Sequence, residues 1–292
     1  METWQLHIKL IPGILIGLIF CYVPMAGLVL AFQSYTPGKG FFGSPWVGLD
    51  VFRVMFNLPD IYPVIRNTVI ISLQKIFGTL LFALIFALLI NELRVRFIAR
   101  VFQTIFLFPF FLSWVVLGGI FVDILSNQGA VNSVLTLLGI ENVFFMGDNS
   151  WFRPVLLTTH IWASFGYSMV IILAAMAGID PTLYESAKID GANRWQQTLH
   201  ITIPGVTGMI ILLLVLNLGF IMSAGFDQVF NMYNPVVYET GDIIDTYVFR
   251  IGIQKAQYSL ATAVGLFKSL IGFILVSLSY LAAAKFMDYR IF

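Results

Sequence analysis

Six long apolar stretches constrain this chain more than any other feature. Each has about the length, roughly 20 residues, that a helix needs to cross the ~30 Å hydrocarbon core of a membrane. They lie at about residues 10–32, 68–90, 102–125, 155–179, 206–226 and 260–284. Charged residues make up only 11% of the chain, less than half the ~25% of an average globular domain. The sequence therefore predicts an all-α membrane protein with six transmembrane helices, as a single domain over residues 1–292.

Several classes of protein can be set aside at this point. The first stretch is longer than the ~7–15-residue apolar core of a signal peptide and lacks a clear cleavage site, which favours an uncleaved span. The formal net charge of +1 gives no basic excess for binding nucleic acid. Cys21 is the only cysteine, so no intramolecular disulfide or cysteine-based metal site is expected.

The loops indicate an orientation. With the N-terminus inside, lysine and arginine are denser in the cytoplasmic loops than in the outer ones, as the positive-inside rule requires. We therefore expect a multi-pass protein of the bacterial inner (plasma) membrane with both termini in the cytoplasm. The outer segments 33–66 and 227–259 are rich in apolar and aromatic residues, which predicts that they are ordered and that the first holds a short interfacial helix.

The cytoplasmic segment 180–204, between the fourth and fifth stretches, is much longer than a simple connector needs to be. Asp180 followed by Pro181 is typical of a helix start, Gly191 of a left-handed helix stop, and Asn193 of the cap of a second short helix. These signals predict a helix, a sharp turn and a second helix. An amphipathic helix resting on lipid headgroups is the simpler alternative.

The same segment resembles a known family. Its sequence Glu185-Ser-Ala, followed by Gly191 and by Ile201-Thr-Ile-Pro204, is similar to the EAA loop of permease subunits of binding-protein-dependent ABC importers. It departs from the common pattern mildly, at Ser186 and Ile203. The flanking residues resemble the sugar-uptake branch that includes the maltose system. Other stretches, such as Tyr22-Val-Pro-Met and Gly225-Phe-Asp-Gln-Val-Phe230, resemble permeases for complex oligosaccharides and polysaccharide fragments.

The resemblance implies a type I ABC importer permease fold with a cytoplasmic coupling helix between helices 4 and 5. It implies that Glu185, Ala187, Asp190 and Gly191 transmit movement from an ATPase. The implied partners are a second, homologous permease subunit in a heterodimer, two cytoplasmic ATPase subunits, an extracytoplasmic sugar-binding protein and membrane lipid. ATP and Mg would bind the partner ATPases, with no cofactor on this chain, and the imported substrate would be an oligosaccharide or a polysaccharide-derived sugar.

The residues themselves agree that another protein supplies the energy. The chain contains no G-x-x-x-x-G-K-[ST] phosphate loop, and its only Gly-Lys pair is Gly38-Lys39 in an outer loop. It is therefore predicted to be a non-catalytic subunit.

Polar residues inside the apolar stretches indicate a path or internal pairing, because charges are costly there. Lys75, Asp123 and Lys268 are the intramembrane charges, and a buried pair between Asp123 and one of the lysines is favoured over substrate contact. The candidate residues of a sugar path are His160, Trp162, Asn217 and Phe220, which combine polar groups with flat apolar faces.

Two alternatives remain. An ion-gradient-driven secondary transporter would place more acidic residues at the membrane midplane and often shows an inverted repeat, and neither is evident. An intramembrane enzyme would need a catalytic cluster such as H-E-x-x-H, whereas the three histidines, His7, His160 and His200, fall on different segments.

Overall fold

The computed structural model describes residues 2–287. Over this range the chain is helical, and its only β-type pairing is an isolated bridge between Gln33 and Trp46. The contacts divide the chain into two compact units. The first unit is Met1–Tyr62 with Ile244–Leu270, and the second is Pro63–Ile243 with Ile271–Phe292. The prediction that 1–292 is one domain stays a prediction.

The first unit holds a long N-terminal helix and several short ones. Its elements are α1 (Glu2–Gly17), η1 (Leu18–Tyr22), η2 (Val23–Phe32), α2 (Gly40–Gly43), α3 (Asp50–Asn57), α14 (Ile244–Phe249), η6 (Arg250–Gln254) and the first part of α15 (Tyr258–Met287). Aromatic side chains hold the outer segment in place: Phe32 stacks on Trp46 at 5.6 Å between ring centroids, and Phe56 meets Phe267 at 5.3 Å. The prediction that residues 33–66 are ordered and contain a short helix is confirmed.

The second unit contains nearly all of α4 and all of α8, two of the longest helices of the described chain, and it also contains the end of α15. Its elements are α4 (Ile61–Asn91, whose first two residues belong to the first unit), α5 (Arg96–Leu107), η3 (Phe108–Phe111), α6 (Trp114–Ile124), α7 (Ala130–Leu137), α8 (Asn149–Ala177), α9 (Pro181–Ile189), α10 (Arg194–Gln197), η4 (Thr198–Thr202), α11 (Ile203–Leu218), α12 (Phe226–Met232), η5 (Pro235–Val237) and α13 (Tyr238–Gly241). The ordered structure expected after residue 227 is confirmed by α12, α13 and α14.

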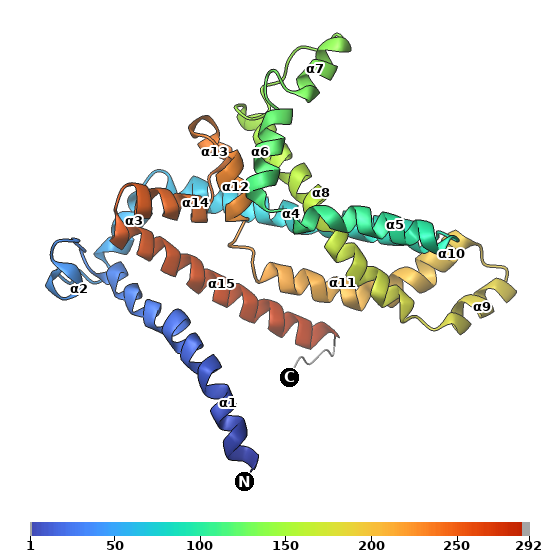
Figure 1. The fold of residues 1–292 in the computed structure, drawn as a ribbon, viewed down its shortest axis with the longest axis horizontal. Coiled ribbons are helices and arrows are strands. Elements are labelled where there is room, and N and C mark those ends of the chain that lie inside the picture. The colour runs from blue at the N-terminus through green and yellow to red at the C-terminus, as the bar shows by residue number, and fades with distance from the viewer. Residues whose placement is uncertain (1, 288–292) are drawn as a thin grey trace. The chain divides into compact units, whose positions relative to one another are not determined.

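Two apolar clusters form the core of the second unit. In the first, Ala83, Met169 and Val206 are fully buried where α4, α8 and α11 meet. In the second, Phe152 and Val229 are fully buried between α8 and α12. Helix α5 packs along α8 (Figure 1). The first cluster packs α4 against α8, and both helices supply residues to the candidate site described below.

The helices agree with most of the predicted spans. Five are long and apolar enough to cross a membrane, at His7–Phe32, Ile61–Asn91, Asn149–Ala177, Arg194–Leu218 and Tyr258–Leu281. A sixth span results if Arg96–Phe111 and Trp114–Ile124 are counted together.

The predicted third span, 102–125, is not one continuous helix. Its two parts are bent by 98° relative to each other, so that α6 turns away from α5 (Figure 1). Pro109 lies in the tight turn η3 that ends the first part, and proline cannot donate the backbone hydrogen bond that a continuing helix needs. Ser113 then caps the new helix by accepting a hydrogen bond from the backbone N–H of Val116 at 3.4 Å.

The fifth span also differs from its predicted range, 206–226. Helix α11 begins at Ile203, continuing from α10 and η4, and ends at Leu218. A turn follows up to Gly225, whose φ of +89° is open to glycine and costly for other residues. The hydropathy pattern missed this end because the turn is as apolar as the helix.

Candidate functional site

The segment between α8 and α11 begins as its sequence predicts. The Asp180 side chain accepts a hydrogen bond from the backbone N–H of Thr182 at 2.9 Å, and Pro181 is the first residue of α9. The hydrogen bonds from Thr182 lower the pKa of the exposed Asp180 carboxyl below its ordinary value of 3.8. An ionised carboxylate at this position also stabilises the positive end of the helix dipole.

Gly191 ends α9 in the left-handed conformation, with φ of +81°. The backbone N–H of Gly191 donates to Lys188 O at 3.1 Å, and that of Ala192 donates to Ala187 O at 2.8 Å. These two bonds form a Schellman motif, in which glycine is the preferred residue. Asn193 and Gln196 then form a reciprocal capping box at the start of α10. The predicted helix, turn and helix are confirmed.

Two side-chain contacts brace this segment against the long helices. Arg194 Nη1 lies 2.6 Å from Glu92 Oε2 at the end of α4. The Tyr184 hydroxyl lies 2.9 Å from Thr202 Oγ1, just before α11. Arg194 therefore joins the segment to α4, and Tyr184 joins α9 to η4, which continues into α11.

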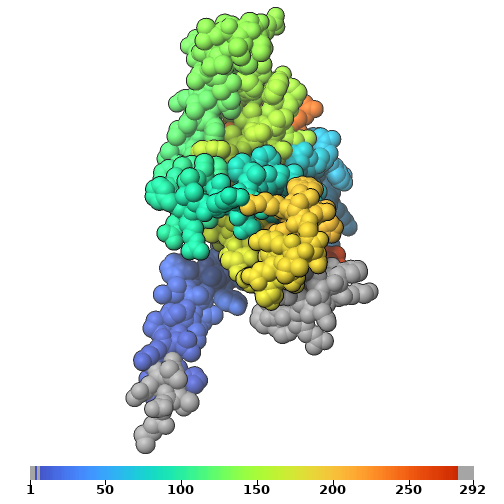
Figure 2. Space-filling model, turned by 90° about the vertical axis from the view of Figure 1, so that its right-hand side faces the viewer, coloured from blue at the N-terminus to red at the C-terminus, as the bar shows by residue number. Residues whose placement is uncertain are grey.

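The predicted coupling residues face outward. Glu185, Asp190 and Gly191 are exposed and Ala187 is half-buried. Large apolar side chains are exposed beside them, with Ile189 at 88% and Trp195 at 71%. Figure 2 shows the yellow to orange surface of this segment uncovered at the front. Such a protruding surface of apolar and charged groups is suited to insertion into a groove on another protein.

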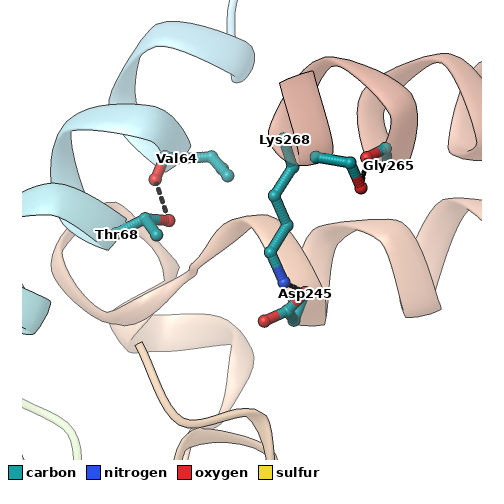
Figure 3. Close-up of polar contacts among 6 residues, drawn as sticks. Val64, Thr68, Asp245, Gly265 and Lys268 are labelled. Atoms are coloured by element: carbon teal, nitrogen blue, oxygen red, sulfur yellow. Dashed lines mark hydrogen bonds and ion pairs between the residues drawn. The ribbon is translucent and has the colours of Figure 1, made fainter. Parts of the chain in front are cut away.

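The intramembrane charges are placed differently from our expectation. Lys268 forms an ion pair with Asp245 at 2.5 Å, between α15 and α14 (Figure 3). Lys75 is buried and donates to the backbone oxygen of Ala224 at 2.6 Å. Asp123 is exposed near the end of α6. The predicted pairing of Asp123 with a lysine is therefore wrong, because Asp123 is exposed and the two lysines bond to Asp245 and to the backbone of Ala224 instead.

A cavity of about 340 Å³ opens between α4, α8 and the turn after α11. His160, Asn217 and Phe220, three of the four predicted path residues, lie on its wall. The full lining in the described chain is Ser72, Lys75, Ile76, Thr79, Leu80, Phe110, His160, Ser164, Tyr167, Ser168, Asn217, Phe220, Ser223, Ala224 and Gly225. The cavity thus combines hydroxyl groups, one lysine, one histidine and aromatic rings.

Trp162 does not line this cavity. It packs edge-on against Phe121, with 5.6 Å between the ring centroids. On α8 the lining residues His160, Ser164 and Tyr167 follow helical spacing, whereas residue 162 is offset from His160 by about 200° around the helix. Its role in a sugar path stays a prediction.

The small polar residues that α4 and α8 contribute to the cavity, besides Lys75 and His160, were not predicted. Ser72, Lys75 and Thr79 recur at helical spacing on α4, and Ser164 and Ser168 do so on α8. This periodicity of small polar residues inside apolar stretches was the available signal. No group of three or more His, Cys, Asp or Glu residues in the described part of the chain is placed to hold a metal ion.

Comparison with known proteins identifies the family. Residues 79–290 match the family described as "Binding-protein-dependent transport system inner membrane component". The chain belongs to this family. The match begins in α4 and includes the α9–α10 segment.

Individual relatives support the assignment over nearly the whole chain. Protein LplB of Bacillus subtilis is 40% identical over 98% of this chain and 90% of its own length. The polygalacturonan/rhamnogalacturonan transport system permease protein YteP of the same organism is 38% identical over 100% of this chain and 91% of its own. In a crystal structure of a bacterial alginate ABC transporter, in complex with alginate pentasaccharide-bound periplasmic protein, one chain superposes with a TM-score of 0.91 at 35% identity. That match covers 99% of this chain and 97% of the other.

Family membership decides among the three predicted classes. The chain is a multi-pass permease subunit with the type I ABC importer fold, as predicted. It is a transport component and not an enzyme. The same findings favour binding-protein-dependent import over transport driven by an ion gradient.

Proposed function

We propose that this permease is one of two transmembrane subunits of an ATP-driven importer for oligosaccharides derived from polysaccharides. The sugar class is supported by the names of its relatives, which describe transport systems for polygalacturonan/rhamnogalacturonan and for alginate. The observation that carries the mechanism is the exposed and braced α9–α10 segment. A transporter driven only by an ion gradient needs no such surface for another protein.

Coupling takes place at this segment. Glu185, Ala187, Asp190 and Gly191 insert into a groove on a cytoplasmic ATPase subunit, and ATP with Mg binds the two ATPases. When the ATPases close, they move α9 as a rigid body, because small helices clasped in grooves transmit such rotations. The bonds of Arg194 to Glu92 and of Tyr184 to Thr202 then pass the movement on to α4 and α11.

The complete importer contains four kinds of partner. They are a second, homologous permease that forms a heterodimer with this chain, two ATPase subunits, an extracytoplasmic sugar-binding protein and the surrounding lipid. The chain lies in the bacterial inner membrane with both termini in the cytoplasm, as the distribution of lysine and arginine in its loops favours. Nucleic acid is not a partner.

The sugar crosses the membrane along the wall that includes His160, Asn217 and Phe220. His160 lies on α8, Asn217 lies at the end of α11, and Phe220 lies in the turn after it; α9 and α10 connect these two helices. Movement of the α9–α10 segment therefore acts directly on the helices that line the cavity. This arrangement supports alternating access, in which the cavity opens to one side of the membrane at a time.

The proposal is tested with the importer isolated from membranes through an affinity tag on this chain. We expect an ATPase to co-purify, and ATP hydrolysis to rise when the sugar-loaded binding protein is added. Glu185→Ala should reduce both, because it alters the surface that contacts the ATPase. Glu141→Ala changes an exposed glutamate outside this segment and should behave like the unmodified protein. Absence of any associated ATPase, or equal behaviour of the two variants, would contradict the proposal.

A further inference from the structure

Lys75 is a buried lysine with unused hydrogen-bonding capacity. Its side chain lines the cavity, only 4% of the residue is exposed, and its Nζ donates to the backbone oxygen of Ala224. An ammonium group has three N–H donors, and this bond uses one. None of the described residues that line the cavity is acidic; Asp227 lines a separate pocket that shares Phe110 and Ser164 with it. The cavity therefore presents a basic group that has no acidic partner among the described lining residues.

Two hydroxyl groups beside Lys75 also lack partners. Ser72 is 3% exposed and Thr79 is 8% exposed, and neither hydroxyl forms a hydrogen bond within the described chain. Serine and threonine in apolar helices commonly bond to the backbone oxygen four residues earlier, as Thr68 does to Val64 at 2.8 Å (Figure 3). Ser72 and Thr79 do not, although a buried polar group without a partner is costly. They lie one turn on either side of Lys75 and line the same cavity.

Aromatic rings lie on the cavity wall as well. Phe110 and Tyr167 stack at 4.6 Å between centroids, and Phe220 is 71% exposed. Apolar faces of this kind accept the C–H faces of a sugar ring, while a few placed polar groups fix its orientation. The cavity volume of about 340 Å³ lies within the range of small-ligand sites.

We propose that this cavity binds a uronic acid residue of the transported sugar. Lys75 pairs with the sugar carboxylate, Ser72 and Thr79 bond to the carboxylate or to sugar hydroxyls, and the aromatic rings support the ring face. The site makes the permease selective for acidic over neutral oligosaccharides. The inference rests on the proposed function, because it names the substrate class of the same path.

A purely structural role for Lys75 makes a different prediction. The bond to Ala224 holds the turn between α11 and α12, and removing it would weaken binding of every sugar alike. A recognition role affects only sugars that carry a charge. The two roles are separated by comparing an acidic sugar with its uncharged methyl ester, which has nearly the same shape.

The experiment measures direct binding to the purified importer, with ATPases present and binding protein omitted, by isothermal titration calorimetry. The probes are trisaccharides of galacturonate, glucuronate and mannuronate, each as the free acid and as the methyl ester. We expect the unmodified complex to bind at least one acid tenfold or more tightly than its ester. Lys75→Met should remove this preference, Lys75→Arg should keep most of it, and Lys9→Met, at an exposed lysine of α1, should leave it intact.

Three results would overturn the inference. They are no preference for any acid in the unmodified complex, a preference that survives Lys75→Met, and an equal loss of acid and ester in Lys75→Met. Each result counts only in a complex whose ATP hydrolysis still responds to sugar-loaded binding protein. With that response intact, any of the three results contradicts the uronate site and leaves the importer function standing. Loss of that response in the unmodified complex would instead contradict the proposed function.

Discussion

Replacing Gly191 tests whether the shape of the α9–α10 turn transmits the ATPase movement. A Cβ at this position would meet nothing within 4 Å, so only the left-handed φ of +81° opposes a side chain. Alanine in this conformation costs about 1–2 kcal/mol, and asparagine costs less because it tolerates the left-handed region. Proline cannot adopt it, because its ring fixes φ near −65°. Proline also removes the N–H that donates to Lys188 O at 3.1 Å, a bond worth about 1 kcal/mol.

Transport should therefore fall in the order asparagine, alanine, proline. Since about 1.4 kcal/mol corresponds to a factor of ten in an equilibrium, the cost of about 1–2 kcal/mol should reduce coupled uptake by Gly191→Ala roughly thirtyfold at most. Gly191→Pro should abolish uptake while the protein remains inserted in the membrane. The assay is uptake of labelled oligosaccharide into proteoliposomes per ATP hydrolysed, with insertion followed by membrane fractionation.

Gly139 provides a matched control. It ends α7 with φ of +76°, and a Cβ there would also meet nothing within 4 Å. Its N–H donates to Thr136 O, and that of Ile140 donates to Leu135 O, so the same motif is present outside the α9–α10 segment. Gly139→Pro should preserve the ratio of uptake to hydrolysis. Wild-type uptake by Gly191→Pro, or an equal loss in Gly191→Asn and Gly191→Pro, would refute the reasoning.

Two further predictions concern helix packing and capping. Gly166→Ala should lower the melting temperature of the purified complex and cost about 1–3 kcal/mol, because a Cβ would lie 2.0 Å from the backbone oxygen of Phe106 on α5. Gly208→Ala, which adds a Cβ in open space on α11, should leave the melting temperature unchanged. Equal melting temperatures of the two variants would contradict this packing. Asp180→Ala should speed hydrogen exchange at the Thr182 amide at neutral pH, while Asp180→Asn, which can still accept the bond, should change it little. Because the pKa of Asp180 is lowered, its capping is fully present above pH 3.8 and is lost as the pH falls through the lowered pKa. Hydrogen exchange at Thr182 in the unmodified protein should therefore approach that of the alanine variant only in strong acid. If the two proteins exchanged alike at a higher pH, the assigned pKa shift would be wrong.

Local sequence signals determined much of this protein. The length of each apolar stretch indicated the helices, and Asp180, Gly191 and Asn193 predicted the turn between α9 and α10. These features depend on a few adjacent residues, through hydrogen bonds that each helix end must satisfy. The family resemblance of the same segment was visible because its motif is also local.

Packing decided the remaining features. The bend at Pro109, the end of α11 at Leu218 and the partners of the two lysines all depend on contacts across the fold. Lys75 bonds to a residue 149 positions away. The hydropathy of apolar helices does not indicate which of them pack together, so it cannot predict such a partner. The polar side chains on α4 and α8 recur at helical spacing in the sequence, but only the tertiary structure places them around one cavity.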